Sequence, residues 1–326
     1  MTSWTSMSST TSPTPAGKVV VVTPNPAVDV TYQSPEHRVG EVNRVTTVTR
    51  RPGGKGLNVA SVLTQLGVPV RVTGFLGGHG GQEIQALLGD APVQQTWVTI
   101  GGATRSTTAI VSDSGTTLFN EPGPTVTSAD WEELTAATTT GLDIGDVLVV
   151  SGSCPPGTTD EDLRRLLVAA RNVGAHTILD TSGDLLVAAA GGSDVLKPNR
   201  EELQQATGLP DPEAGAQLLL DRGARAVIVS AGPDGMDLYL AGRSWRATPP
   251  MEVKGNPTGA GDAAVAALAA GLLGDTPVTT ALPDTLASAV ALSAAAVLMP
   301  IAGVVDLDAY HQFLPNVNVK QTNDSR

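Results

Sequence analysis

The chain has 326 residues, 41% of them hydrophobic, which suits one large domain or one domain with an appendage. Its formal net charge of −12 argues against a nucleic-acid or anionic-membrane partner, although a few local cations can still hold a small anion in a pocket. The single cysteine, Cys154, excludes an internal disulfide, so the sequence favours a reducing, cytoplasmic setting.

The two ends of the chain are predicted to be tails. Residues 1–17 are rich in Ser, Thr and Pro and have neither the basic start nor the apolar stretch of a secretion signal, so we expect them to be disordered. Between the ends we expect one domain over residues 18–315, followed by a C-terminal tail over residues 316–326.

Short apolar runs rich in β-branched residues recur through this domain and predict strands. Helical spacing appears between most of them, at residues 56–66, 160–170 and 200–207. Strands that alternate with helices form βαβ units, so the sequence predicts an α/β fold with a mainly parallel sheet covered on both faces. The predicted strands are residues 19–22, 70–75, 147–150, 177–179, 195–196 and 226–229.

Two regions, residues 37–51 and 97–120, break this rhythm. Thr and Val alternate in them, and the second contains the turn signal Asp113-Ser114-Gly115. Neither region has a helical period. They predict antiparallel strands set apart from the main sheet.

The segment over residues 286–305 carries no charge and is long enough to span a membrane. It consists mostly of Ala, Ser and Val, with Pro300 and Gly303 near its end. A helix that is apolar all round is also typical of a packed core. We favour a buried helix here.

Polar residues follow each of the six predicted strands. Singly, each is typical of a turn or a helix cap. In open α/β sheets, however, ligands bind beyond the carboxyl ends of the strands, so six polar strand ends in succession indicate a ligand cleft. These residues are Thr23, Asn25, Asp29, Gly77, Gly78, Ser151 to Ser153, Asp180, Lys197, Asn199, Ser230 and Gly232.

The stretch NPTGAGD, residues 256–262, precedes an apolar helical run. A carboxylate such as Asp262 near the first turn of a helix can be a simple electrostatic cap. The glycines Gly259 and Gly261 need another reason, because they allow close approach of the backbone and expose its N–H groups at the positive end of the helix dipole. Together they indicate an anion site that carries its own carboxylate.

The usual nucleotide and hydrolase motifs do not occur in the sequence. There is no G-x-x-x-x-G-K-[ST], the GGHGG at residues 77–81 does not complete G-x-G-x-x-G, and GSCPPG is no G-x-S-x-G elbow. The four histidines lack metal-ligand spacing. What remains suits phosphoryl transfer, which needs a base, N–H donors and metal-bridged phosphates.

Seven motifs in order, spread over residues 19–306, carry a resemblance to a known family. The sequence resembles the ribokinase-type PfkB carbohydrate kinases, most closely the 1-phosphofructokinase and tagatose-6-phosphate kinase branch. The resemblance implies a three-layer α/β/α fold with a small β-sheet lid, whose strands would lie within residues 37–51 and 97–120. The motifs are TPNPAVD (23–29), GGKGLNVASVLTQLG (53–67), TRSTTAIV (104–111), SGSCPPG (151–157), LKPNREEL (196–203), SAGPDG (230–235) and PTGAGD (257–262).

The resemblance also implies roles for individual residues. Asp262 would be the catalytic base, and Gly259, Ala260 and Gly261 would form the anion hole. Substrate would be bound by Asp29, Gly53, Gly54 and Asn58 at its hydroxyls and by Lys55, Arg105 and Ser151 at its phosphate. ATP would be bound by Lys197, Asn199, Ser230, Gly232 and Gly235, with Glu202 acting on Mg²⁺ and the adenine near the 286–303 helix. Ala263, where many relatives have Ser, and Cys154, where Leu is common, depart from the pattern.

The function implied is ATP-dependent phosphorylation of a phosphorylated ketohexose, such as fructose 1-phosphate, tagatose 6-phosphate or fructose 6-phosphate. One alternative is a kinase of an unphosphorylated sugar or nucleoside, but a neutral sugar gives Lys55 and Arg105 nothing to neutralise. Another is a non-catalytic sugar-binding regulator, but such a protein would be expected to lose Asp262. The resemblance further implies a homodimer formed through the lid. From the cysteine content and the charge we expect a cytoplasmic protein without nucleic-acid or membrane partners.

Overall fold

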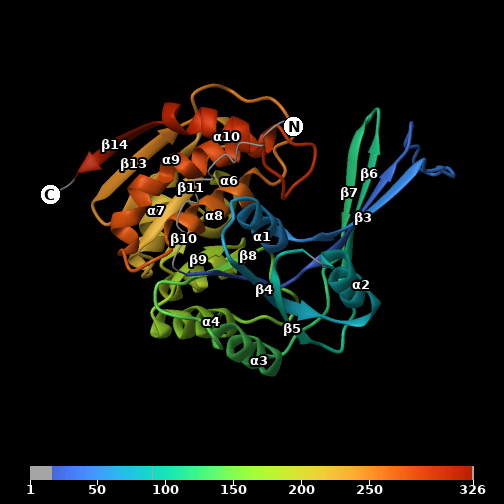
Figure 1. The fold of residues 1–326 in the computed structure, drawn as a ribbon, viewed down its shortest axis with the longest axis horizontal. Helices are drawn as coiled ribbons and strands as arrows, with labels where there is room; N and C mark the ends of the chain where they lie inside the picture. Colours follow the sequence, from blue (N-terminus) through green and yellow to red (C-terminus); the bar gives the residue numbers. More distant parts are fainter. Residues whose placement is uncertain (1–16, 90, 325–326) are drawn as a thin grey trace, which may run out of the picture.

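A ten-stranded sheet runs through the computed structural model of the chain, which describes residues 17–89 and 91–324 (Figure 1). From β11 to β5 all neighbouring strands are parallel, and β12 to β14 extend one edge in antiparallel fashion. In spatial order the strands are β14 (Asn318–Asp324), β13 (Arg243–Thr248), β12 (Met236–Leu240), β11 (Ala226–Ser230), β10 (Val195–Leu196), β9 (His176–Asp180), β8 (Val147–Ser151), β1 (Val19–Thr23), β4 (Val70–Leu76) and β5 (Gln94–Thr99).

The six predicted strands all fall in this sheet, which confirms the mainly parallel α/β architecture. Their apolar runs do not alternate with polar residues because both faces of the sheet are covered. In β1, for example, Val19 and Val21 belong to the core on one face, and Val20 and Val22 belong to the core on the other.

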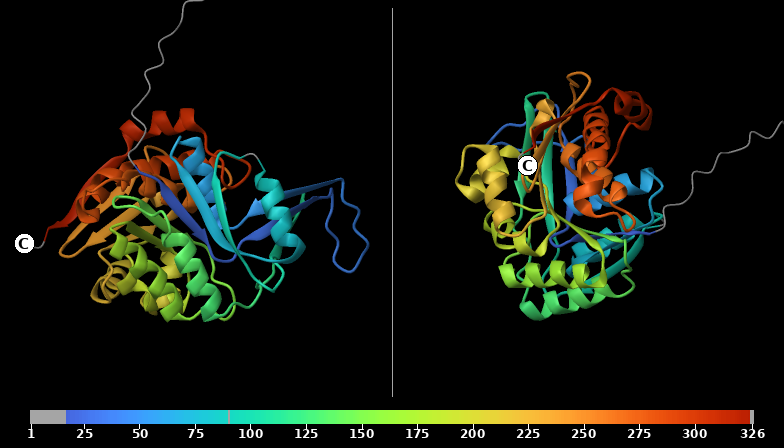
Figure 2. Two further views of the ribbon diagram at one scale, coloured as in Figure 1. Left: turned by 60° about the horizontal axis from the view of Figure 1, so that its bottom comes forward. Right: turned by 90° about the vertical axis from the view of Figure 1, so that its left-hand side faces the viewer.

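Helices form a layer on each face of the sheet (Figures 1 and 2). The capping box Asn199-x-x-Glu202 begins α6, which starts and ends where the sequence predicted. One face carries α1 (Lys55–Gln65), α8 (Ala260–Gly271), α9 (Val278–Val297) and α10 (Leu307–Phe313). The other face carries α3 (Ser128–Thr139), α4 (Asp160–Val173), α5 (Asp184–Ala188), α6 (Arg200–Thr207) and α7 (Pro212–Asp221).

A second, four-stranded sheet projects from one end of the main sheet (Figure 1). Its order is β3 (Thr47–Gly53), β2 (Ala27–Gln33), β6 (Arg105–Ser112) and β7 (Gly115–Asn120), and α2 (Gly78–Leu88) packs against β2 and β3. The separate small sheet confirms the prediction, but its details differ. β2 was not predicted, β2 and β6 are parallel, and residues 97–99 belong to β5 of the main sheet.

The C-terminal segment differs from the tail predicted over residues 316–326. Asn318–Asp324 forms β14, which pairs with the edge strand β13. Val317 and Val319 pack against the core. Backbone pairing with β13 and the burial of these two side chains therefore hold a segment whose sequence is mostly polar. The N-terminal tail predicted over residues 1–17 lies outside the described residues, apart from Gly17.

The buried helix predicted over residues 286–305 is α9, which begins earlier and ends at Val297. Pro283, which cannot donate a backbone hydrogen bond, lies inside its early turns, and Pro300 follows its end. By length and composition α9 is apolar enough to cross a membrane, but half of its apolar window is buried inside the protein. It packs against α8, α10, β12 and β13, as a core helix does.

Gly271→Ala tests how closely α8 and α9 pack. A Cβ at Gly271 would lie 2.6 Å from Thr285 Oγ1, and Thr285 is buried and donates to Ala281 O. Overpacking costs about 1–3 kcal/mol, which exceeds the roughly 0.5–1 kcal/mol that Ala gains over Gly in a helix. We expect urea unfolding to show a loss of about 1–2 kcal/mol in stability. Gly101→Ala, in a loop where nothing lies within 4 Å, is the control for an open site, and equal effects of both changes would contradict close packing.

Candidate active site

The polar strand ends of the main sheet meet at one edge, as the parallel topology requires. Thr23 ends β1, Ser151 ends β8, Asp180 ends β9, and Lys197 follows β10. The small sheet begins at the same edge, because only three residues separate the end of β1 from Ala27, the first residue of β2. Both sheets therefore contribute to one candidate site.

Asp262 lies in the first turn of α8, at the centre of this edge. Gly259 is the N-cap with φ +89°, and a Cβ there would lie 2.8 Å from Ala302 Cα, so the turn requires glycine. A Cβ at Gly261 would lie 3.7 Å from the ammonium nitrogen of Lys197. The N–H of Ala260 donates to the Pro257 carbonyl at 3.2 Å, whereas that of Gly261 lies at the helix N-terminus with a buried cation beside it, which favours an anion.

Burial makes the Asp262 carboxyl group a stronger base than an ordinary aspartate. Its side chain is 6% exposed, and its Oδ2 accepts a hydrogen bond of 2.8 Å from Asn58 Nδ2. Burial and the charge of Asp180 raise the pKa of Asp262 to about 6, against the opposing effects of Asn58, Lys55 and Lys197. The group is therefore ionised at neutral pH and basic enough to accept a proton.

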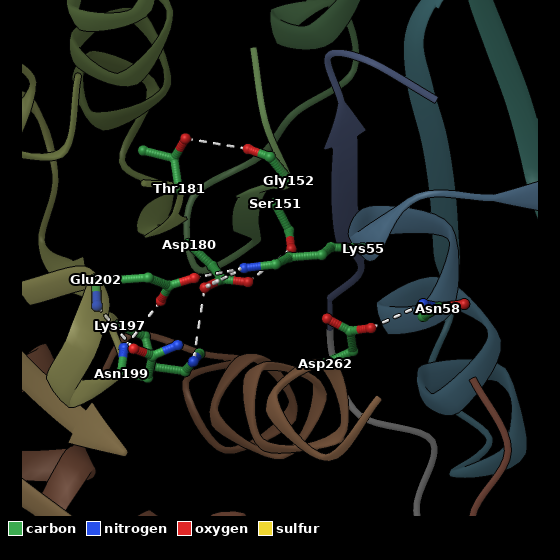
Figure 3. Close-up of polar contacts among 10 residues, drawn as sticks. All are labelled: Lys55, Asn58, Ser151, Gly152, Asp180, Thr181, Lys197, Asn199, Glu202 and Asp262. Atoms are coloured by element: carbon green, nitrogen blue, oxygen red, sulfur yellow. Dashed lines mark hydrogen bonds and ion pairs between the residues drawn. The ribbon is translucent and has the colours of Figure 1, made fainter. Parts of the chain in front are cut away.

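A cluster of two lysines and two carboxylates lies beside Asp262 (Figure 3). Lys55 Nζ is 3.1 Å from Glu202 Oε1 and 3.7 Å from Asp180 Oδ1. Lys197 Nζ is 3.6 Å from the same Asp180 oxygen. Burial lowers the pKa of Lys55, but Asp180 and Glu202 raise it by more, so the ammonium group stays charged.

Each carboxylate of this cluster is oriented by its other oxygen. Asp180 Oδ2 accepts a hydrogen bond of 3.0 Å from Ser151 Oγ, and Glu202 Oε2 accepts one of 2.9 Å from the backbone N–H of Asn199. The predicted residues Ser151 and Asn199 thus hold carboxylates, rather than pointing freely into the site. The sequence predicted Asp180 only as one of the polar strand ends at the ligand cleft, without a role in binding substrate, ATP or Mg²⁺.

The carboxylates fit a Mg²⁺ ion that arrives on a nucleotide. No group of three or more His, Cys, Asp or Glu side chains within residues 17–89 and 91–324 could hold a metal. Mg²⁺, however, is usually bound by one or two carboxylates together with substrate phosphates. Asp180 Oδ1 is buried without a hydrogen-bond partner, which leaves an acceptor for a cation. Glu202 and Asp180 are the residues that would hold such an ion.

The small sheet contributes Asp29 and Arg105. A Cβ at Gly53 would overlap the Asp29 carboxyl group, so Gly53 leaves the space that this side chain occupies. Burial raises the pKa of Asp29 to about 6, although Arg105 and Arg51 oppose the shift. The glycine before Lys55, Gly54, is the N-cap of α1 with φ +108°.

Arg105, the first residue of β6, is held by two backbone carbonyls in loops. Its Nε donates to the Asn25 carbonyl at 3.1 Å and its Nη1 to the Glu121 carbonyl at 3.2 Å. An arginine in this region could instead pair with a carboxylate of the lid such as Glu41, but Glu41 pairs with Arg38. Burial lowers the pKa of Arg105, yet an arginine remains charged, so the guanidinium is a fixed positive charge near Asp29.

A pocket of about 390 Å³ opens beside the start of α8, where Pro257 and Ala260 line it. Its walls are mostly apolar, which suits the flat ring of a ligand rather than a phosphate. Ser230 lies outside it and bridges to Asn199 through the backbone. The lining includes the predicted residues Gly232, Gly235 and Ala260, with Val290, Ala294 and Val297 of α9.

The chain is similar to known carbohydrate kinases in sequence and in fold. The family model described as pfkB family carbohydrate kinase matches residues 18–303. Phosphofructokinase-2 from Escherichia coli in complex with fructose-6-phosphate has 28% sequence identity and a TM-score of 0.80, covering 92% of this chain and 98% of that one. A "possible 1-phosphofructokinase" from Thermotoga maritima has 25% identity and a TM-score of 0.78, covering 94% and 100%. Ribokinase from Arabidopsis thaliana, at 21% identity and a TM-score of 0.68, covers 92% and 99% and shares the fold.

Asp262→Asn is expected to stabilise the protein at pH 8. The pKa of Asp262 is raised from 3.8 to about 6, so its contribution to stability is present below pH 3.8 and lost as the pH rises through about 6. The neutral amide avoids this loss and can still accept the hydrogen bond from Asn58. We expect the free energy of unfolding to rise by about 1–3 kcal/mol at pH 8 and by less at pH 5.

The matched control is Asp146→Asn. Asp146 is also buried, but it forms an ion pair of 2.7 Å with Lys18, so its neutralisation should destabilise the protein. Urea unfolding of both variants measures the difference. A loss of stability in Asp262→Asn at pH 8 would contradict the raised pKa.

Proposed function

The chain belongs to the pfkB family of carbohydrate kinases, and on that premise we propose that it transfers a phosphoryl group from ATP to a phosphorylated ketohexose, with Asp262 as general base. The observation that carries the proposal is the buried Asp262 carboxyl group, with a pKa of about 6, at the N-terminus of α8. The substrates we propose are fructose 1-phosphate, tagatose 6-phosphate and fructose 6-phosphate. The E. coli relative with bound fructose-6-phosphate supports this class.

In this mechanism Asp262 accepts the proton of the attacking sugar hydroxyl. The N–H groups of Gly259, Ala260 and Gly261 stabilise the charge of the transferred phosphoryl group at the positive end of α8. Lys197 adds a buried positive charge beside the same turn. A hydroxyl held between base and anion hole is in position to attack, which is most of what phosphoryl transfer requires.

The two substrates are proposed to bind on opposite sides of Asp262. On the sugar side, hydroxyls would bind Asp29, Asn58 and the backbone at Gly53 and Gly54, while Lys55, Arg105 and Ser151 lie near the substrate phosphate. On the ATP side, Lys197 and Asn199 would bind phosphates, and Ser230, Gly232 and Gly235 would flank the nucleotide, with its adenine in the 390 Å³ pocket against α9. Bound Mg²⁺ neutralises nucleotide phosphates, and Glu202 and Asp180 would hold it.

The small sheet is proposed to act as a lid and as the contact of a homodimer. Leu118 and Phe119 are exposed on β7, and Val39 and Val42 are exposed in the loop between β2 and β3. Exposed apolar side chains of this kind favour association. The E. coli phosphofructokinase-2 has a tetrameric inhibited form, which shows that a relative assembles. A cytoplasmic location is part of the same proposal.

An ADP-release screen tests the proposal against its alternatives. Fructose 1-phosphate, fructose 6-phosphate, tagatose 6-phosphate and the free hexoses are compared as acceptors with Mg²⁺ and ATP. The highest kcat/KM on one of the phosphosugars is expected. A preference for a free sugar or a nucleoside would favour the alternative kinase, and no turnover on any acceptor would favour a non-catalytic sugar-binding regulator.

Asp262→Asn should abolish most turnover while the protein stays folded. A positioned base contributes about 10²–10⁴-fold, so we expect kcat to fall on the order of 10³-fold. Wild-type kcat/KM should fall as the pH drops through about 6, where Asp262 and Asp29 both become protonated. Asp29→Asn, the same chemical change on the sugar side, is the control and should act mainly on the sugar KM. A variant Asp262→Asn that keeps more than about a tenth of wild-type kcat would exclude this base.

Arg105→Ala should raise the KM for the phosphosugar by roughly 10–100-fold and leave the KM for ATP nearly unchanged. A phosphate held equally in ground state and transition state affects KM rather than kcat. The loss of two hydrogen bonds to carbonyls, at Asn25 and Glu121, will also reduce stability, but that effect penalises every sugar alike. The ratio of kcat/KM on a ketohexose phosphate to that on free fructose separates the two effects. An unchanged ratio would contradict the phosphate contact.

A further inference from the structure

Lys55 contacts both carboxylates that would hold the metal ion (Figure 3). We propose that Lys55 and the divalent cation compete for Glu202 Oε1 and Asp180 Oδ1, so that arrival of the metal-bound nucleotide releases the Lys55 ammonium toward the phosphate of the sugar substrate. This inference rests on the proposed function, and it adds a coupling between the two substrates.

The oxygens in question have no other role in the described residues. Glu202 Oε2 caps α6 through the Asn199 N–H, and Asp180 Oδ2 accepts from Ser151. Glu202 Oε1 accepts only from Lys55, at 3.1 Å, and Asp180 Oδ1 faces the two ammonium groups without a hydrogen bond. Each carboxylate is thus fixed by one oxygen and presents the other to a cation.

Of the two lysines, Lys55 is the one that can move. Its side chain is 41% exposed, whereas that of Lys197 is 3% exposed. Lys55 is also the first residue of α1, where the positive end of the helix dipole disfavours a cation and no acidic residue of the first turn compensates. Glu202 and Asp180 therefore hold an ammonium group that its own helix repels.

A divalent ion at these oxygens would remove the attraction that keeps Lys55 there and add repulsion between like charges. Lys55 follows the sugar signature glycines Gly53 and Gly54, so its backbone already lies on the sugar side. The released ammonium, which also feels the charge of Asp262, is then free to approach the phosphate of the sugar substrate. Binding of the metal nucleotide should strengthen binding of the phosphosugar, and by reciprocity the phosphosugar should strengthen binding of the metal nucleotide.

The first test is a Mn²⁺ titration of the nucleotide-free protein, followed by electron paramagnetic resonance. Lys55→Met removes the competing cation, and we expect Mn²⁺ to bind about 10-fold more tightly, a value kept modest because Lys55 is partly exposed to solvent. Lys320→Met changes the net charge equally on the distant strand β14, and Lys55→Arg keeps the charge, so neither should tighten Mn²⁺ binding. Equal or weaker Mn²⁺ binding by Lys55→Met would overturn the competition.

The second test measures the protein without substitutions. A variant at Lys55 is needed only to assign the Lys55 signal. Lysines are methylated reductively with ¹³C, and the Lys55 signal is identified by its loss in Lys55→Arg. Addition of Mg²⁺ with a non-hydrolysable ATP analogue should shift this signal, while calorimetry on the same sample confirms nucleotide binding. A Lys55 signal that stays unchanged on saturation with the nucleotide would overturn the release.

Neither test requires a sugar or any turnover. Failure of the ADP-release screen with a positive Mn²⁺ result would therefore refute the proposed substrate and leave the competition standing. A positive screen with unchanged Mn²⁺ binding in Lys55→Met would refute the competition alone.

Discussion

The buried carboxylate of Asp180 is the constraint on which the arrangement of the site depends. With a side chain 1% exposed, it needs opposite charge and hydrogen bonds close by, since an uncompensated buried charge costs about 3–5 kcal/mol. Those partners come from three separate segments: Ser151 at the end of β8, Lys197 after β10 and Lys55 at the start of α1. The start of α1 and the loop after β10 are thereby held together through one side chain at the carboxyl end of β9.

Helix α8 positions Asp262 and the glycines of its first turn. It is apolar on nearly every side because it packs between α1, α9 and the sheet, and this burial is also what raises the pKa of Asp262 at its first turn. The same packing that stabilises the helix therefore makes ionised Asp262 costly. A basic carboxylate in an apolar surrounding is a common compromise between stability and activity.

Much of the fold follows from local sequence. The central strands are recognisable because a strand buried on both faces must be apolar and β-branched throughout, as Val19 to Val22 are. The start of α6 is recognisable because the side chains of Asn199 and Glu202 each bind the other's backbone N–H group. The turn before α8 is recognisable because position 259 has a positive φ and no room for a Cβ, so it requires glycine. The ordered motifs were enough to indicate a sugar kinase, which the family match confirms.

The tertiary structure alone decided which of these residues meet. Strand β14 looks like a polar tail, because its place depends on an open edge at β13 rather than on its own pattern. The contacts of Lys55 with Glu202 and of Asn58 with Asp262 join residues 147 and 204 positions apart. No local propensity encodes such pairs. They form because parallel strands bring their carboxyl ends to one edge of the sheet. A charge that loses its water at this edge is stable only beside an opposite charge or a hydrogen-bond donor.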